Sequence, residues 1–202
     1  MKSHTLLRIL PAAALALALP HAARADQVKP PPVPAAIQVP AGAKAFLEGH
    51  GVGTQNYVCL PAITSGTSAF AWTLFTPQAT LFADDGKQLT THFFGPNPVE
   101  GGRVRVAWQH SRDTSSVWGQ LVAPSSDPAF VAPGAIPWLL IQVVGTQAGP
   151  DGGDTLTAAR YIQRLNTAGG VAPATGCAAA ADVGKQAFVP YTADYFFFLA
   201  AE

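Results

Sequence analysis

Short apolar runs, broken about every eight to twelve residues by Gly, Pro, Asn or Asp, are the feature that most constrains this fold. Runs of this length suit β-strands, and their frequent interruption leaves little room for long helices. We therefore predict an all-β, single-domain antiparallel sandwich or barrel over residues 41–202, with long loops and at most one short helix. The expected strands are 44–49, 54–60, 70–75, 80–83, 88–93, 103–109, 117–122, 138–144 and 191–199.

The segment 155–167 has two interpretations. Its apolar residues Leu156, Ala159, Ile162 and Leu165 have helical spacing, whereas Tyr161 and its neighbours favour a strand. Periodicity does not choose between them, so helix and strand both stay open here.

The first 25 residues have the order of a secretory signal peptide. Lys2 and Arg8 flank a polar start, an Ala- and Leu-rich run covers 9–19, and Ala23-Arg24-Ala25 supplies small residues at the cleavage positions. The apolar run is well below the roughly 20 residues that a helix needs to cross a bilayer. We predict cleavage after Ala25 and a secreted or periplasmic protein.

Residues 26–40 contain five prolines after Gln27, which predicts an extended N-terminal arm, either a linker or a segment laid over the surface.

Loss of the leader removes three basic residues, so the mature chain has nine Lys and Arg against twelve Asp and Glu. A mildly acidic domain without a dense basic cluster argues against a nucleic-acid partner.

Cys59 and Cys177 are the two cysteines of the chain. Two thiols in an exported protein most often form one bridge, so we predict a Cys59–Cys177 disulfide. A reactive thiol and a shared metal site are the alternatives, but neither cysteine lies in a CxxC or beside a histidine.

A specific series of short strings runs along the chain. It comprises Ala79-Thr80-Leu81-Phe82, Asp85-Gly86, His92-Phe93, Gly95-Pro96, Ile136-Pro137-Trp138-Leu139-Leu140, Tyr161-Ile162-Gln163-Arg164, Asn166-Thr167, Gly169-Gly170, Ala172-Pro173, Cys177 and Val189-Pro190-Tyr191-Thr192-Ala193-Asp194-Tyr195-Phe196. In this order the strings resemble a family of secreted bacterial and fungal proteins catalogued as domain of unknown function 3455, over roughly residues 35–200. The resemblance implies a β-rich secreted domain and no established reaction. Family members tend to have Trp after the Gly-Pro, whereas Asn97-Pro98 stands there in this chain.

Some fungal relatives carry a malate dehydrogenase label, which calls for a nucleotide-binding glycine motif. The nearest match, Gly49-x-Gly51-x-Gly53, has the wrong spacing and lies between two strand-like runs. We interpret it as a flexible turn, and we predict no cofactor and no metal site.

Catalytic signals are weak elsewhere. No Gly-x-Ser-x-Gly motif is present, and the acidic residues lie in loop-like stretches typical of solvated turns. His92 lies at the end of the expected strand 88–93 and precedes the Gly95-Pro96 turn, so it could be a general base, a ligand or a structural donor.

A polar set in the last third of the chain gives the remaining candidates. Arg and Asp in apolar, β-prone segments are costly to bury unpaired, so we predict an Arg164–Asp194 ion pair near the disulfide. The candidate binding residues are His92, Arg164, Asn166, Tyr191, Asp194 and Tyr195.

Two classes of function remain. The first is a noncatalytic binding or structural domain that takes a small molecule, glycan or protein through loops and exposed aromatics such as Trp72, Trp108, Trp118 and Trp138, of which Trp72 and Trp138 suit the core better. The second is a hydrolase or metal-assisted enzyme centred on His92. Sequence alone favours the first.

Overall fold

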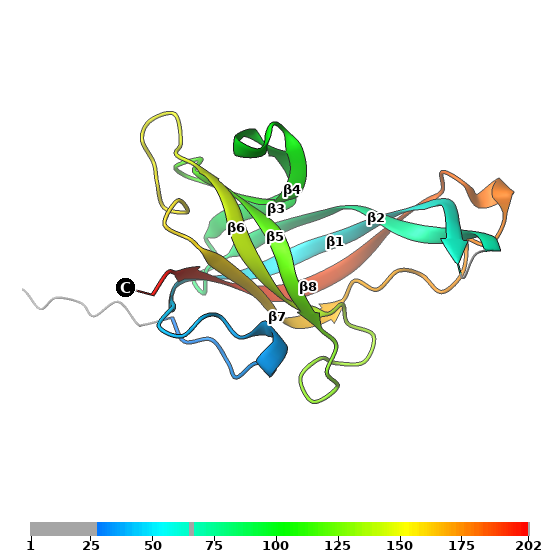
Figure 1. Cartoon of the computed structure of the whole chain (residues 1–202), viewed down its shortest axis with the longest axis horizontal. Helices are drawn as coiled ribbons and strands as arrows, with labels where there is room; N and C mark the ends of the chain where they lie inside the picture. Colours follow the sequence, from blue (N-terminus) through cyan, green and yellow to red (C-terminus); the bar gives the residue numbers. More distant parts are fainter. Residues whose placement is uncertain (1–27, 65–66, 202) are drawn as a thin grey trace, which may run out of the picture.

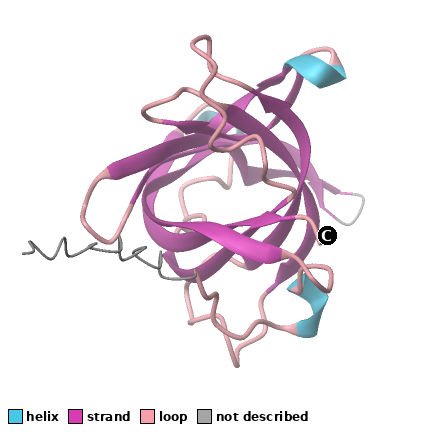
Figure 2. Ribbon diagram, turned by 90° about the vertical axis from the view of Figure 1, so that its left-hand side faces the viewer, coloured by secondary structure: helices cyan, strands magenta, loops and turns pink. Residues whose placement is uncertain are grey.

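The computed structural model describes residues 28–64 and 67–201, which form a closed barrel of eight antiparallel strands (Figures 1 and 2). Each strand pairs with the next along the chain, and β8 pairs back with β1. The strands are β1 (Lys44–Thr64), β2 (Thr67–Phe82), β3 (Gln88–Asn97), β4 (Arg103–His110), β5 (Ser116–Ser125), β6 (Trp138–Gln147), β7 (Tyr161–Gly169) and β8 (Gln186–Leu199). Three short 3-10 segments are η1 (Ala35–Ile37), η2 (Pro98–Glu100) and η3 (Ala180–Asp182). The predicted all-β fold is confirmed, and the architecture is a barrel.

The expected strands coincide with observed ones, but two pairs of them merge. The runs 44–49 and 54–60 are parts of β1, and 70–75 and 80–83 are parts of β2. Beyond the barrel wall, β1 and β2 continue together as a long hairpin (Figure 1). The predicted leader, 1–25, lies outside the described residues.

The glycines of Gly49-x-Gly51-x-Gly53 form a stripe on the inner face of β1, so their interpretation as a flexible turn was wrong. A Cβ on Gly51 would lie 2.8 Å from the Tyr195 ring, and one on Gly53 would lie 2.1 Å from the Gln78 carbonyl oxygen. Glycine is therefore required at these alternate positions of β1, because a larger side chain would collide with the neighbouring strands.

The ambiguous segment is mainly a strand, because β7 begins at Tyr161. The preceding residues form a turn whose Leu156 and Ala159 are fully buried at one end of the barrel. Asp113 holds this turn through the Thr155 N–H, at 3.0 Å, and the Ser115 hydroxyl donates to the same carboxylate. Although burial raises the pKa of Asp113, these hydrogen bonds outweigh it and hold the pKa well below its ordinary value. The helical spacing thus reflects residues that close the barrel end.

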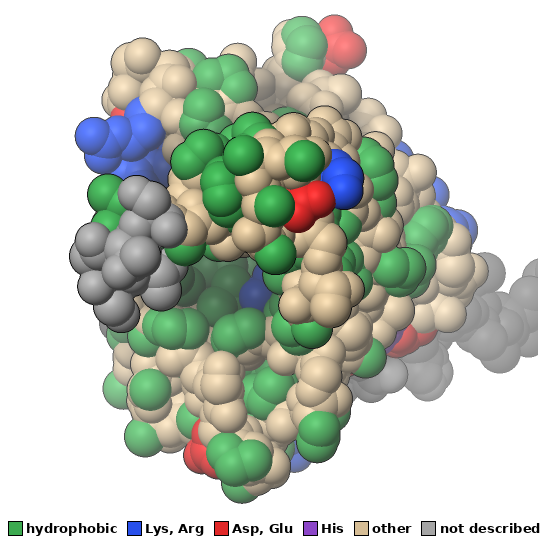
Figure 3. All heavy atoms as spheres, turned by 90° about the vertical axis from the view of Figure 1, so that its right-hand side faces the viewer, with side chains coloured by type: hydrophobic (Ala, Val, Ile, Leu, Met, Phe, Trp, Pro, Cys, Tyr) green, Lys and Arg blue, Asp and Glu red, His purple; other side chains and the backbone are tan. Residues whose placement is uncertain are grey.

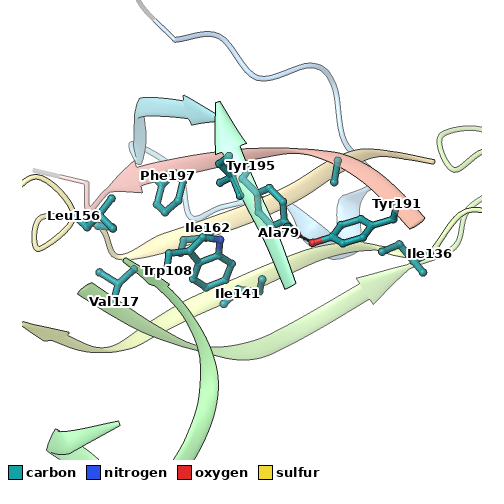
Figure 4. Packing of buried hydrophobic residues seen from close by; sticks show 13 residues of the cluster. Ala79, Trp108, Val117, Ile136, Ile141, Leu156, Ile162, Tyr191, Tyr195 and Phe197 are labelled. Carbon is teal, nitrogen blue, oxygen red and sulfur yellow. Dashed lines mark hydrogen bonds between the residues drawn. The ribbon is translucent and has the colours of Figure 1, made fainter. Parts of the chain in front are cut away.

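The interior core consists of apolar side chains from alternate positions of the strands, as Figure 4 shows. On β8, Tyr191, Ala193, Tyr195 and Phe197 face inward, while Phe196 and Phe198 belong to a second cluster outside the barrel.

The arm that precedes β1 covers this second cluster. Ile37 of η1 is fully buried there, and the Gln163 amide donates to the Ile37 carbonyl at 2.7 Å. Trp138 also packs in this outer cluster, at 5% exposure. The arm is laid over the surface, which explains why β8 is apolar on both faces. Among the described residues, no helix is long and apolar enough to cross a membrane.

The Cys59–Cys177 disulfide is formed, with the two Cα atoms 5.5 Å apart. It joins β1 to the long connection between β7 and β8. The same connection is held by backbone hydrogen bonds of Cys59 to Gly184 and Lys185, and the Trp72 indole N–H donates to the Thr175 carbonyl. Trp72 is half-buried against this connection, so its expected place in the core was wrong.

Replacing both cysteines with alanine should lower the free energy of unfolding by about 2 to 5 kcal/mol, because a bridge over 118 residues restricts the unfolded chain. Urea unfolding of the oxidised wild type and the double variant measures this difference. We expect the variant to keep the barrel, since the β1 backbone still binds the connection. Equal urea midpoints for the two proteins would show that the bridge adds no stability.

Candidate functional site

A cavity of about 420 Å³ lies inside the barrel, beside the interior core. Figure 3 looks into it, and its walls are largely hydrophobic, with a basic side chain visible deep inside. It opens at the barrel end formed by the start of β4 and β6 and the end of β3. Its lining comprises Gln55, Tyr57, Leu74, Pro77, His92, Phe94, Val104, Arg105, Val106, Gly119, Gln120, Leu121, Ile136, Pro137, Leu139, Ile141, Arg164 and Tyr195.

Arg164 lies at the inner end of this cavity and is only 8% exposed. Its position on β7 faces inward, as does that of its cross-strand neighbour Tyr195. The guanidinium Nη2 donates to the Pro137 carbonyl at 2.9 Å, and Nε has no hydrogen-bond partner. No carboxylate of the described residues forms an ion pair with it. The cavity therefore contains a buried positive charge whose hydrogen-bonding capacity is incompletely used.

His92 forms another part of the cavity floor. Its ring stacks on Trp108 at 4.4 Å between centroids, and its Nδ1 donates to the Ala107 carbonyl at 3.0 Å. Burial lowers the pKa of His92 to about 3, and the charge of Arg164 adds to this effect. The imidazole is neutral at ordinary pH, with its proton on Nδ1.

Two tyrosines of β8 follow, of which Tyr195 lines the cavity. The side chains of Tyr191 and Tyr195 point toward one another along the strand, with their hydroxyls 3.0 Å apart (Figure 4). Burial raises the pKa of both tyrosines, so both stay uncharged. The Gln55 amide nitrogen, also buried in the lining, has no partner at hydrogen-bond geometry.

The mouth of the cavity contains a second arginine, but this one is neutralised. Arg105 donates from Nε and Nη2 to the two carboxylate oxygens of Glu100, at 2.8 and 2.7 Å. Arg105 lowers the pKa of Glu100 to about 2. Asn97 accepts from the Val99 N–H and donates to Glu100, so it caps η2 and positions this pair.

A separate polar cluster lies on the outer face of β1 and β8. Each ring nitrogen of His50 lies 2.7 Å from a carboxylate oxygen, Nδ1 from Asp194 and Nε2 from Asp84. Asp194, and then Asp84, raises the pKa of His50. Glu48, His50 and Asp194 lie close enough for one metal ion to reach all three, with ligand atoms within 4.8 Å of one another. Such an ion would have to displace the proton between His50 and Asp194.

The six predicted binding residues fall into two groups. His92, Arg164 and Tyr195 line the cavity, and the Tyr191 hydroxyl contacts that of Tyr195, whereas Asn166 and Asp194 lie outside and bond each other at 2.7 Å. The predicted Arg164–Asp194 ion pair was wrong. Asp194 is the cross-strand partner of Leu165, so its side chain points to the opposite face of the sheet from Arg164.

The tryptophans do not form an exposed binding surface either. Trp108, Trp118 and Trp138 are 0%, 8% and 5% exposed. Sequence reasoning also missed Gln55 and Tyr57, which lie among the small residues of β1. Their alternation with the glycine stripe was the available signal, because it places both on the inner face.

Lowering the pH from 7 to 5 should reduce the free energy of unfolding by about 2 kcal/mol through His92 alone. Its pKa is below the ordinary 6.5 in the folded protein, so the unfolded chain takes up a proton in this range that the folded chain does not. Urea titrations at the two pH values measure the loss, and His92→Asn, whose amide can still donate to Ala107, should remove most of it.

His50→Asn provides the comparison of opposite sign. The raised pKa of His50 means that its contribution is present at low pH and is lost as the pH rises through that pKa. Its replacement should therefore cost more stability at pH 5 than at pH 8.

An unchanged pH dependence in His92→Asn would show that the buried imidazole titrates normally.

The sequence profile of the family described as Protein of unknown function (DUF3455) matches residues 40–199. The match covers the whole barrel and every residue of the cavity lining. No curated protein matches the chain. No solved structure matches it.

Proposed function

We propose that this chain, which belongs to the DUF3455 family, is an exported binding protein that holds a small, largely apolar molecule inside its barrel. The observation that carries the proposal is the cavity of about 420 Å³ with its open mouth and apolar walls. Small-molecule sites usually measure roughly 300–1,000 Å³ and often lie in the mouths of β-barrels. Eight-stranded barrels are just wide enough to hold one such ligand.

The composition of the walls supports an apolar ligand over a sugar. Leu74, Phe94, Val106, Leu139 and Ile141 face the cavity, and each square ångström of apolar surface buried contributes roughly 25 cal/mol. Sugar sites need many polar partners for the ligand hydroxyls, whereas most of the side chains that line this cavity are apolar. On the outside of the described residues we find no surface that supports a protein partner as strongly as the cavity supports a small molecule.

Binding is also better supported than hydrolysis centred on His92. The described residues that line the cavity include no Asp, Glu, Ser or Cys that could act together with that histidine. His92 itself is fixed by a backbone carbonyl and a stacked indole, as a structural residue would be.

Export is the second part of the proposal. It is supported by the signal-peptide pattern of residues 1–25 and by the disulfide, which suits an oxidising compartment. Expression of the full chain in a bacterium with a general secretion system should yield protein that begins at Asp26 in the periplasm or the medium. Amino-terminal sequencing measures this, and intact protein with Met1 in the cytosol would contradict it.

The binding function is tested with 1-dodecanol, an uncharged apolar probe. Isothermal titration should show one site per chain. Leu121→Trp, which places an indole in the mouth, should weaken the affinity at least fivefold, because Leu121 lines the cavity. Val122→Trp is the matched control: its residue is exposed to a similar degree, 53% against 50%, but does not line the cavity.

We expect Val122→Trp to bind within twofold of the wild type. Absence of 1-dodecanol binding by the folded wild type would overturn the proposed function. An equal loss of affinity in both tryptophan variants would place the binding outside the cavity.

A further inference from the structure

We propose that the ligand is an anionic amphiphile, an apolar molecule with a single carboxylate, and that it binds with the carboxylate innermost on Arg164. This inference rests on the proposed function, because it assigns the ligand class and its orientation within the same cavity.

The first argument is the state of Arg164. A guanidinium has five N–H donors, and burying its charge without a partner carries a large desolvation cost. Arg164 is 92% buried, yet its one hydrogen bond to another residue that meets normal geometry goes to the Pro137 carbonyl, and its Nε is unpartnered. A structural arginine at this depth would be expected to face a carboxylate, and the described residues supply none.

The second argument is the position of the free donors. The Nε of Arg164 and the amide nitrogen of Gln55 both belong to residues that line the cavity, and both are buried and unpartnered. Gln55 is only 2% exposed. A carboxylate accepts several hydrogen bonds at once and pairs well with a guanidinium, so it is the ligand group that best suits Arg164 in this lining.

The third argument is the distribution of charge. Arg105 is the other cation of the lining, and Glu100 neutralises it with two hydrogen bonds at the mouth. His92 is neutral because of its burial. Arg164 therefore provides the net positive charge of the cavity, and that charge lies at the inner end.

The fourth argument concerns the rest of the ligand. Beyond Arg164 the lining is mainly apolar, and it includes Leu74, Val104 and Leu121, which are 36%, 65% and 50% exposed. An apolar tail that leaves the carboxylate would therefore contact mainly apolar side chains on its path to the mouth. This arrangement orients the ligand with its head inside and its tail toward solvent.

The test compares dodecanoate with 1-dodecanol, which has the same chain without the charge, by isothermal titration below the micelle concentration. Wild-type protein should bind dodecanoate at least tenfold more tightly than 1-dodecanol. Arg164→Met, which keeps most of the side-chain volume, should lose this preference while it binds 1-dodecanol as the wild type does. Arg164→Lys keeps a charge without the planar fork and should retain part of the preference. The matched control is Arg103→Met, a change at an exposed arginine outside the cavity lining, which should bind dodecanoate within twofold of the wild type.

The outcomes separate this inference from the proposed function. If the wild type binds both probes equally and Arg164→Met changes neither affinity, the apolar cavity stands and the anionic ligand is overturned. If the wild type binds neither probe, the proposed function itself fails. If acetate or inorganic phosphate binds as tightly as dodecanoate, the site recognises a small free anion and the amphiphile is overturned. Retained 1-dodecanol binding by Arg164→Met shows that this variant is folded.

Discussion

The pairing of β1 with β8 is the constraint on which the rest of the structure depends. It joins residues more than a hundred positions apart and turns an eight-stranded sheet into a closed wall with one interior. Closure requires β1 to approach its neighbours closely, and the glycine stripe makes this possible because Gly51 leaves room for the Tyr195 ring. The interior then has a fixed volume, which side chains can fill completely or leave partly empty.

The interior of this barrel is filled at one end and empty at the other. Trp108, Phe197 and Leu156 fill the closed end, and the polar floor of His92, Arg164 and Tyr195 separates this core from the cavity. Burying a charge between apolar side chains costs free energy, and such a charge is retained where it has a partner or a function. The placement of polar groups at this boundary is therefore the feature that distinguishes a binding cavity from a packing defect.

The sequence predicted the fold class, most strand positions and the disulfide, because each depends on local pattern or on the count of one residue type. It predicted contacts across strands poorly. Arg164 and Asp194 were placed together because both are polar in apolar segments, but the register pairs Asp194 with Leu165 and so separates the two side chains by the thickness of the sheet. The approach of His50 to Asp194 depends on the same kind of register, between β1 and β8. The glycines of β1 were misjudged because their role depends on close packing against residues of β2 and β8, which are distant in the sequence.

The segment before β6 shows how structural and binding roles share one arginine. Asn166 has a left-handed backbone, with φ of 49°, at a bulge in β7, and this bulge directs the Thr167 hydroxyl to the Ile136 carbonyl at 2.6 Å. Two residues earlier, Arg164 donates to Pro137, so β7 holds the wall segment 136–137 at two points. This contact uses Nη2 and ties the guanidinium to the wall of the barrel. Restricting the side chain before a ligand arrives lowers the entropic cost of binding a planar anion.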